Sequence, residues 1–207
     1  MKLITVPGPV AEKILEALQQ RTTTEHGRTP IVEQVPDARE HFIMIGGTPA
    51  TTEATFDTFT DAHPGAGIVR FSATPRLVSQ IPPDWQLFVG SRVWSRDVQS
   101  GPRSTSIRTY PMHVIAQEGI KDICDTVMES AKDFPALYVS IDLSVLDPAF
   151  APGASAEPGG LTTRELLYFL HRLKLLKNFS AADIVGVPPA ASSELIQLAA
   201  KIIAELS

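Results

Sequence analysis

The 207-residue chain has one cysteine, Cys124, so no disulfide bond can form within it. A chain without disulfides relies on packing for its stability, which suits a reducing compartment, and a small buried residue is the simplest interpretation of Cys124. Long apolar runs are also missing. None is long enough to cross a membrane, and the run at the N-terminus is broken by Pro7 and Gly8, too early for a signal-peptide core. These absences favour a cytoplasmic protein without membrane contact.

Positive charge is scarce and dispersed. The chain has 18 Lys and Arg residues against 23 Asp and Glu residues, which gives a formal net charge of −5, and its basic residues form no cluster. Because nucleic-acid binding needs a basic surface, we expect no nucleic-acid partner. With 43% hydrophobic residues the chain can bury a substantial core, and its length fits a single domain that spans residues 1–207.

Short apolar runs alternate with longer amphipathic stretches along most of the sequence. This pattern predicts strands separated by helices, and therefore an α/β fold. Thr162 and Glu165 have the spacing of a capping box and mark the start of one helix. The expected strands lie at residues 42–45, 67–71, 87–89, 137–141 and 183–187, and the other expected helices at 120–131 and 195–206. Because ligands of a parallel sheet bind beyond the C-terminal ends of its strands, the residues after each strand are the functional candidates.

The most distinctive segment is a strand followed by a loop rich in proline and glycine. It runs Leu137-Tyr138-Val139-Ser140-Ile141-Asp142-Leu143-Ser144-Val145-Leu146-Asp147-Pro148-Ala149-Phe150-Ala151-Pro152-Gly153 and continues through Glu157-Pro158-Gly159-Gly160-Leu161. This segment resembles the arginase, agmatinase and formiminoglutamase (ureohydrolase) family, in which the strand reads Ser-Ile-Asp-x-Asp before an Asp-Pro and two Pro-Gly turns. Gly46-Gly47, Gly90-Ser91-Arg92 and Asp183-Ile184-Val185 are similar to further family motifs in the same order, so the resemblance covers residues 41–207.

The resemblance implies an arginase-like fold with three α/β/α layers around a mostly parallel sheet. It also implies two manganese ions at the strand ends, bridged by a hydroxide that attacks a guanidine carbon. Two dications held close together need several carboxylate and imidazole ligands. The family has a histidine ligand two residues after the Gly-Gly pair, whereas this chain has Pro49, whose side chain offers no donor atom.

Two stretches compete for the family's Asp-Ala-His-x-Asp motif, which supplies three ligands. The literal match is Asp61-Ala62-His63, but it follows closely on Pro49 and has little strand character before it. The other stretch continues the apolar strand at 67–71 and leaves room for a helix after Pro49. We prefer this second alignment, which puts Ser72, Thr74 and Arg76 at the positions of the three family ligands.

The remaining motifs have also lost family residues. Asp142 matches the first aspartate of the strand motif, but Ser144 replaces the second, and Gly186 stands where a glutamate would hold the substrate's guanidinium. Two manganese ions beside one carboxylate and Arg76 would be repelled and under-coordinated, so we hypothesise that Arg76 neutralises Asp142 in their place. We predict a vestigial pocket without catalytic residues or metal, formed by Pro49, Ser72, Thr74, Arg76, Asp142, Ser144 and Gly186.

These losses favour a pseudoenzyme, a ureohydrolase-like domain with a structural, partner or regulatory role. By analogy with the trimers and hexamers of the family, the expected partner is a second copy of the chain or an active paralogue. One alternative stays open. Asp61, His63 and Asp142 are plausible ligands of a reduced manganese site, in which case the protein hydrolyses C–N bonds of linear amidines or guanidines.

Overall fold

A single parallel sheet forms the centre of the molecule. The computed structural model describes residues 2–6, 8–25, 32–33, 39–78, 81–93 and 107–207. The strands are β1 (Lys2–Thr5), β2 (Val32–Glu33), β3 (Phe42–Ile45), β4 (Gly67–Phe71), β5 (Gln86–Val89), β6 (Arg108–Tyr110), β7 (Leu137–Asp142) and β8 (Phe179–Val185). They lie in the order β2-β1-β3-β8-β7-β4-β5-β6, and each neighbouring pair is parallel.

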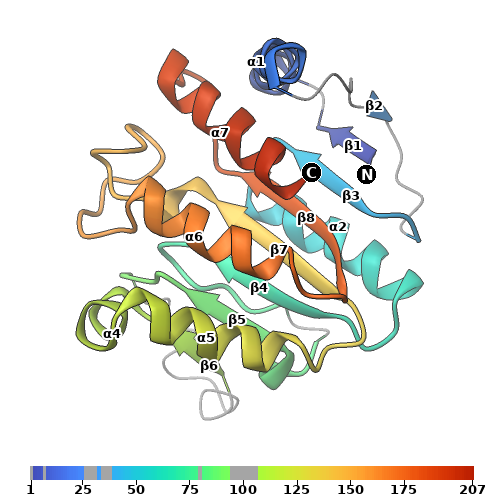
Figure 1. Cartoon of the computed structure of the whole chain (residues 1–207), viewed down its shortest axis with the longest axis vertical. Coiled ribbons are helices and arrows are strands. Elements are labelled where there is room, and N and C mark those ends of the chain that lie inside the picture. Colours follow the sequence, from blue (N-terminus) through green and yellow to red (C-terminus); the bar gives the residue numbers. More distant parts are fainter. Residues whose placement is uncertain (1, 7, 26–31, 34–38, 79–80, 94–106) are drawn as a thin grey trace.

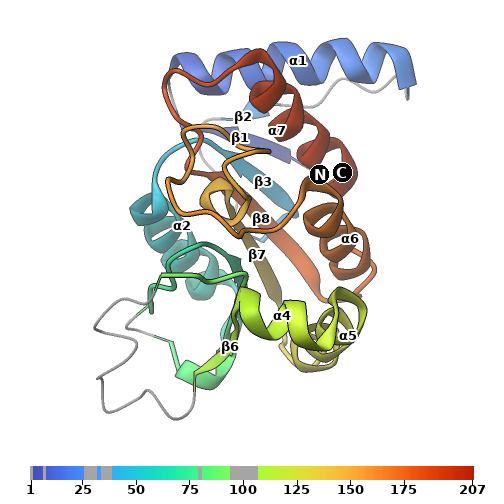
Figure 2. The ribbon, with the colours of Figure 1, turned by 90° about the vertical axis from the view of Figure 1, so that its left-hand side faces the viewer.

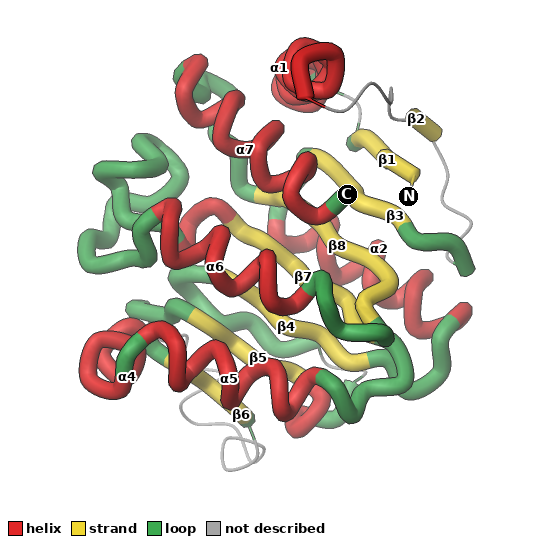
Figure 3. Tube along the Cα trace, viewed as in Figure 1, coloured by secondary structure: helices red, strands yellow, loops and turns green. Residues whose placement is uncertain are grey.

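Helices cover both faces of this sheet. They are α1 (Pro9–Glu25), α2 (Pro49–Ala62), α4 (Met112–Glu118), α5 (Ile120–Ala131), α6 (Thr163–Leu173) and α7 (Ser193–Leu206). In Figure 1 the helices α5, α6 and α7 lie in front of the strands and α2 lies behind them; Figure 3 shows the same view with helices in red and strands in yellow. The predicted three-layer α/β/α architecture is therefore confirmed. None of the described helices combines the length and apolarity that a membrane crossing requires.

The layer between α2 and the sheet is an aromatic cluster. Phe56 and Phe59 of α2 are fully buried against Phe42 of β3 and Tyr138 of β7. The ring centroids of Phe56 and Tyr138 are 5.3 Å apart at an interplanar angle of 81°, the edge-to-face geometry that aromatic pairs prefer. This cluster fixes α2, and with it the loop that enters α2 from β3.

The start of α6 and the end of β8 can be compared with the boundaries that the sequence predicted. At the start of α6, the Glu165 amide donates to Thr162 Oγ1 at 3.2 Å and the Thr162 amide donates to Glu165 Oε2 at 2.7 Å, which confirms the predicted capping box. The strand predicted at 183–187 instead spans Phe179–Val185. It ends there because Gly186 has a φ of +74°, a conformation outside the strand region.

Cys124 lies on the inner face of α5 and is fully buried. Burial raises the pKa of its thiol to about 11, so at pH 8 only about one thiol in a thousand is ionised. We expect the native protein to resist labelling by an aromatic disulfide reagent at pH 8, and the protein in concentrated urea to react rapidly. Rapid stoichiometric labelling of the native protein would show that Cys124 is accessible.

Candidate functional site

Four neighbouring strands bring most of the predicted pocket to one edge of the sheet. β3, β8, β7 and β4 lie side by side and parallel, so the segments that follow them emerge at the same edge. Figure 2 looks toward this edge, with the loop that follows β7 in front. The pocket residues that begin these segments or lie just after the strands are Pro49, Ser72, Thr74, Arg76, Asp142, Ser144 and Gly186.

Asp142 is the centre of a small hydrogen-bonded group. This residue is only 8% exposed. The Ser144 amide donates to Asp142 Oδ1 at 2.9 Å, and the Ser72 hydroxyl lies 3.3 Å from Asp142 Oδ2. Ser72 Oγ also accepts from the Thr74 amide at 3.3 Å, and Ser144 Oγ accepts from the Ala73 amide at 3.3 Å. Hydroxyl and amide groups thus occupy the surroundings of the carboxylate.

Gly186, the residue after β8, lies directly beside the carboxylate of Asp142. A Cβ atom added to Gly186 would lie 2.4 Å from Asp142 Oδ1, closer than real Cβ contacts allow. The Gly186 amide donates to the Gly47 carbonyl at 3.3 Å, which draws the ends of β8 and β3 together. The space in which a side chain at position 186 would begin is therefore filled by the carboxylate of Asp142.

The expected ion pair between Arg76 and Asp142 is absent from the described residues. Arg76 is exposed, and its backbone carbonyl accepts a hydrogen bond from Nη1 of Arg70 at 2.8 Å. The structure therefore shows no direct pair between Arg76 and Asp142, and neutralisation of Asp142 by the charge of Arg76 at longer range stays a prediction. A different arginine, Arg70 of β4, is 4% exposed and lies within the electrostatic reach of Asp142.

Arg70 belongs to a buried polar network that crosses the sheet. In the strand register, Arg70 pairs with Ser140, and Ser140 pairs with Asp183. Asp183 accepts from the Tyr138 hydroxyl at 2.9 Å and from the Ser140 hydroxyl at 2.8 Å, and the hydroxyl of Thr52 in α2 lies 3.4 Å from that of Ser140. All five residues are buried, so this network lies under the pocket edge and faces α2.

Burial changes the titration of the two charged members of this network. Burial raises the pKa of Asp183. The hydrogen bonds from Ser140, Thr52 and Tyr138 and the positive charge of Arg70 act in the opposite direction, but burial has the larger effect. Burial also lowers the pKa of Arg70, although the negative charges of Asp183, Glu53 and Asp142 act to raise it. Each charged group therefore depends on the other for compensation. The sequence signals for this network, overlooked in the search for family ligands, are an arginine and an aspartate inside otherwise apolar strands.

The residues of the alternative metal site lie at the opposite edge. Asp61 is exposed near the C-terminal end of α2, and His63 follows that end, with its ring tilted by 38° against that of Phe59 at a centroid distance of 4.5 Å. α2 begins beside the pocket edge and runs back for 14 residues, about 21 Å, toward the start of β4. In the described structure Asp61 and His63 therefore do not converge with Asp142, so the three residues of the alternative manganese site are not brought together.

The donor atoms at the pocket edge do not fit a pair of manganese ions. Such a pair needs several carboxylates and imidazoles. The described residues contain no group of three or more His, Cys, Asp or Glu side chains placed to hold a metal. Asp142 is surrounded by serines, Pro49 contributes no donor, and the buried charge nearest to this edge on β4 is the positive charge of Arg70.

Arg92 fastens the loop that follows β7 over the same edge. Its guanidinium donates to the carbonyls of Val145 at 2.7 Å, Ser144 at 2.8 Å and Glu157 at 3.1 Å. Asp147 fastens the other end of the loop, because it accepts from the Gly159 amide at 2.7 Å, and such amide hydrogen bonds lower its pKa. Both residues thus hold the backbone of this loop in place.

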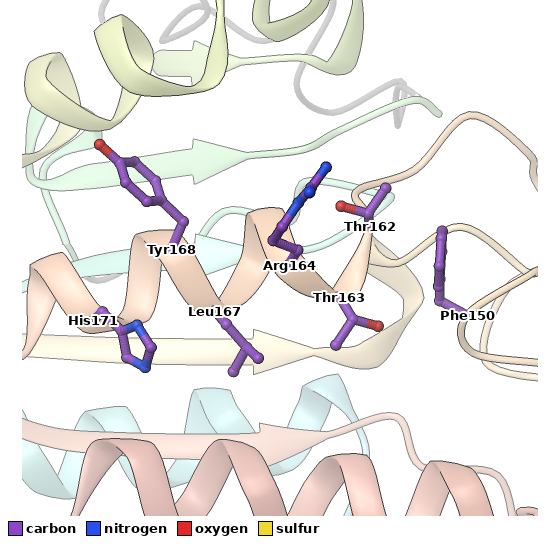
Figure 4. Close-up of a pocket in the computed structure, with 7 residues that line it drawn as sticks. All are labelled: Phe150, Thr162, Thr163, Arg164, Leu167, Tyr168 and His171. Atoms are coloured by element: carbon purple, nitrogen blue, oxygen red, sulfur yellow. The ribbon is translucent and has the colours of Figure 1, made fainter.

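Two hollows of the described surface border α6 and the loop that follows β7. One, of about 650 Å³, runs along α6 (Figure 4). A second, of about 500 Å³, lies between α1 and α7, and Phe150 and Thr163 border both. In Figure 4 Tyr168 points away from Leu167 and His171 across α6, so the hollow follows the outer surface of the helix.

Comparison with known proteins identifies the family. Residues 74–207 match the model of the arginase family, and the chain therefore belongs to that family. It is 43% identical over 125 residues to arginase 1, mitochondrial, of Arabidopsis thaliana, which covers 58% of this chain and 35% of the relative. It is 25% identical over 209 residues to formimidoylglutamase of Halalkalibacterium halodurans, which covers 90% of this chain and 65% of the relative. These matches span about a third to two thirds of the relatives' lengths.

Solved structures confirm the fold. The arginase from Bacillus subtilis superimposes with a TM-score of 0.85 at 15% identity, over 99% of this chain and 97% of that chain. Formimidoylglutamase from Bacillus subtilis superimposes with a TM-score of 0.84 at 18% identity, over 99% of this chain and 85% of that chain. At these identities the likeness concerns the fold, so the chemistry has to be argued from the residues at the strand ends.

Proposed function

We propose that this chain is a noncatalytic member of the arginase family, and that it acts through association with a second copy or with an active paralogue. It keeps the sheet and the loops of a ureohydrolase but lacks the donor atoms that the family's reaction needs. On this proposal the domain has a structural or regulatory role in an assembly.

One observation carries the proposal: the carboxylate of Asp142 fills the space beside Gly186. In the motif that this strand resembles, position 186 holds the glutamate that binds the guanidinium. Here a Cβ at this position would lie 2.4 Å from Asp142 Oδ1, so carboxylate and side chain exclude each other. The hydrogen bonds from Ser144 and Ser72 hold Asp142 in this place. Neither a metal pair nor a guanidinium finds its usual partners.

Metal content tests the proposal without a choice of substrate. We expect far less than one manganese ion per chain by mass spectrometry after incubation with excess Mn²⁺ and desalting, and no release of urea from arginine or agmatine. Arginase from Bacillus subtilis, treated identically, is the positive control. One or two ions per chain, or Mn²⁺-dependent urea release, would contradict the loss of the site. Light scattering on the chain alone, and on its mixture with an active family member, tests the partner. A monomer that also does not bind the active family member contradicts the assembly role.

A further inference from the structure

The central strands of the sheet carry two buried carboxylates. Asp183 is 0% exposed and Asp142 is 8% exposed, and both lie on the central strands β8 and β7. A buried carboxylate is costly unless a charge or a set of hydrogen bonds compensates it. Arg70 of β4, the strand beside β7, is 4% exposed, and its positive charge interacts with the negative charges of Asp183, Glu53 and Asp142.

Arg70 also acts on the loop that replaces the family's ligand motif. Its Nη1 donates at 2.8 Å to the carbonyl of Arg76, at the far end of the segment that starts with Ser72. Ser72 in turn lies 3.3 Å from Asp142 Oδ2. The guanidinium of Arg70 therefore holds the backbone of a loop whose first residue, Ser72, contacts a buried carboxylate.

We propose that Arg70 is a built-in cation that compensates Asp183 and Asp142 and shapes the loop at 72–76, so that the fold is complete without metal. This inference rests on the proposed function, since it explains how a member of the family maintains its central strands after the loss of the ligands. Arg70 is thus a positioning residue. It acts through charge on β7 and β8 and through one hydrogen bond on the loop.

A double-mutant cycle tests this role by thermal unfolding in EDTA and in Mn²⁺. We expect the melting temperature of the wild type to be the same in both. Arg70→Met and Asp183→Asn are each expected to lower it by about 6–20 °C, because each leaves one buried charge uncompensated. The double variant Arg70→Met/Asp183→Asn should melt above the less stable single variant, since both charges have gone. Arg70→Lys should recover part of the loss by keeping the charge.

A surface pair provides the matched control. Arg172 and Asp125 are 2.7 Å apart but their side chains are 35% and 40% exposed, so the cycle with Arg172→Met and Asp125→Asn should shift the melting temperature by no more than about 4 °C. Strictly additive losses in the Arg70/Asp183 cycle, or no loss in Arg70→Met, would overturn the inference. Coupling together with Mn²⁺ stabilisation of the wild type would instead overturn the proposed function. If Arg70→Met does not fold, Asp183→Asn still measures the loss of the buried pair, and an Arg70→Lys protein that folds and melts above Asp183→Asn supports the inference, whereas an Arg70→Lys protein that also does not fold overturns a role through charge.

Discussion

A Gly186→Glu variant, which reintroduces the residue type of the family motif, is expected to unfold at a much lower urea concentration than the wild type. Gly186 has a φ of +74°, a backbone conformation that residues with a Cβ rarely adopt. The new Cβ would lie 2.4 Å from Asp142 Oδ1. We expect a loss of about 4 kcal/mol in the free energy of unfolding, from backbone strain and overpacking together. The new carboxylate would also face that of Asp142. Circular dichroism during urea unfolding measures the loss.

Gly119 provides a control for the strain alone. It has a φ of +95° but nothing lies within 4 Å of an added Cβ, so Gly119→Ala should cost only about 1–2 kcal/mol. Gly186→Ala separates the steric effect from the effect of the added charge. Its loss of unfolding free energy is expected to lie between the losses of Gly119→Ala and Gly186→Glu. A Gly186→Glu protein as stable as Gly119→Ala would show that the pocket edge has room for a side chain. Restoration of the family ligands would then become a realistic experiment.

A Phe56→Ala variant is expected to lose about 3–5 kcal/mol of unfolding free energy. Phe56 is fully buried, with ring centroids 5.3 Å from Tyr138 and 6.0 Å from Phe59, so the truncation opens a cavity between α2 and the sheet. Tyr138 also donates to Asp183, so the cavity adjoins the buried network. Urea unfolding monitored by circular dichroism provides the free energies.

Phe150 provides the matched aromatic control for this prediction. It is 45% exposed on the loop after β7, and Phe150→Ala should change the free energy of unfolding by no more than about 0.5 kcal/mol. Similar losses in the two variants would mean that α2 does not depend on its aromatic face. In that case the aromatic cluster would not be what fixes the loop between β3 and α2.

The sequence alone predicted the elements whose signals are local. The apolar run at 137–141 matches β7, the amphipathic run at 120–131 matches α5, and Thr162 with Glu165 caps α6. These predictions hold because periodicity and capping act within one turn or one strand. The motif around Asp142 likewise indicated the family, since its spacing is a property of consecutive residues.

Only the tertiary structure decided which charged residues meet. Asp61-Ala62-His63 match the first three letters of a ligand motif, yet α2 carries them to the edge opposite Asp142. Arg76 was predicted to neutralise Asp142, but it is exposed and makes no direct pair with Asp142 in the described structure, whereas Arg70 of β4 is buried. The partners of Asp183 come from β4, β7 and α2, up to 131 positions away in the chain. Sequence spacing determines each element, whereas charge compensation depends on distances across the sheet that arise only when the strands pair.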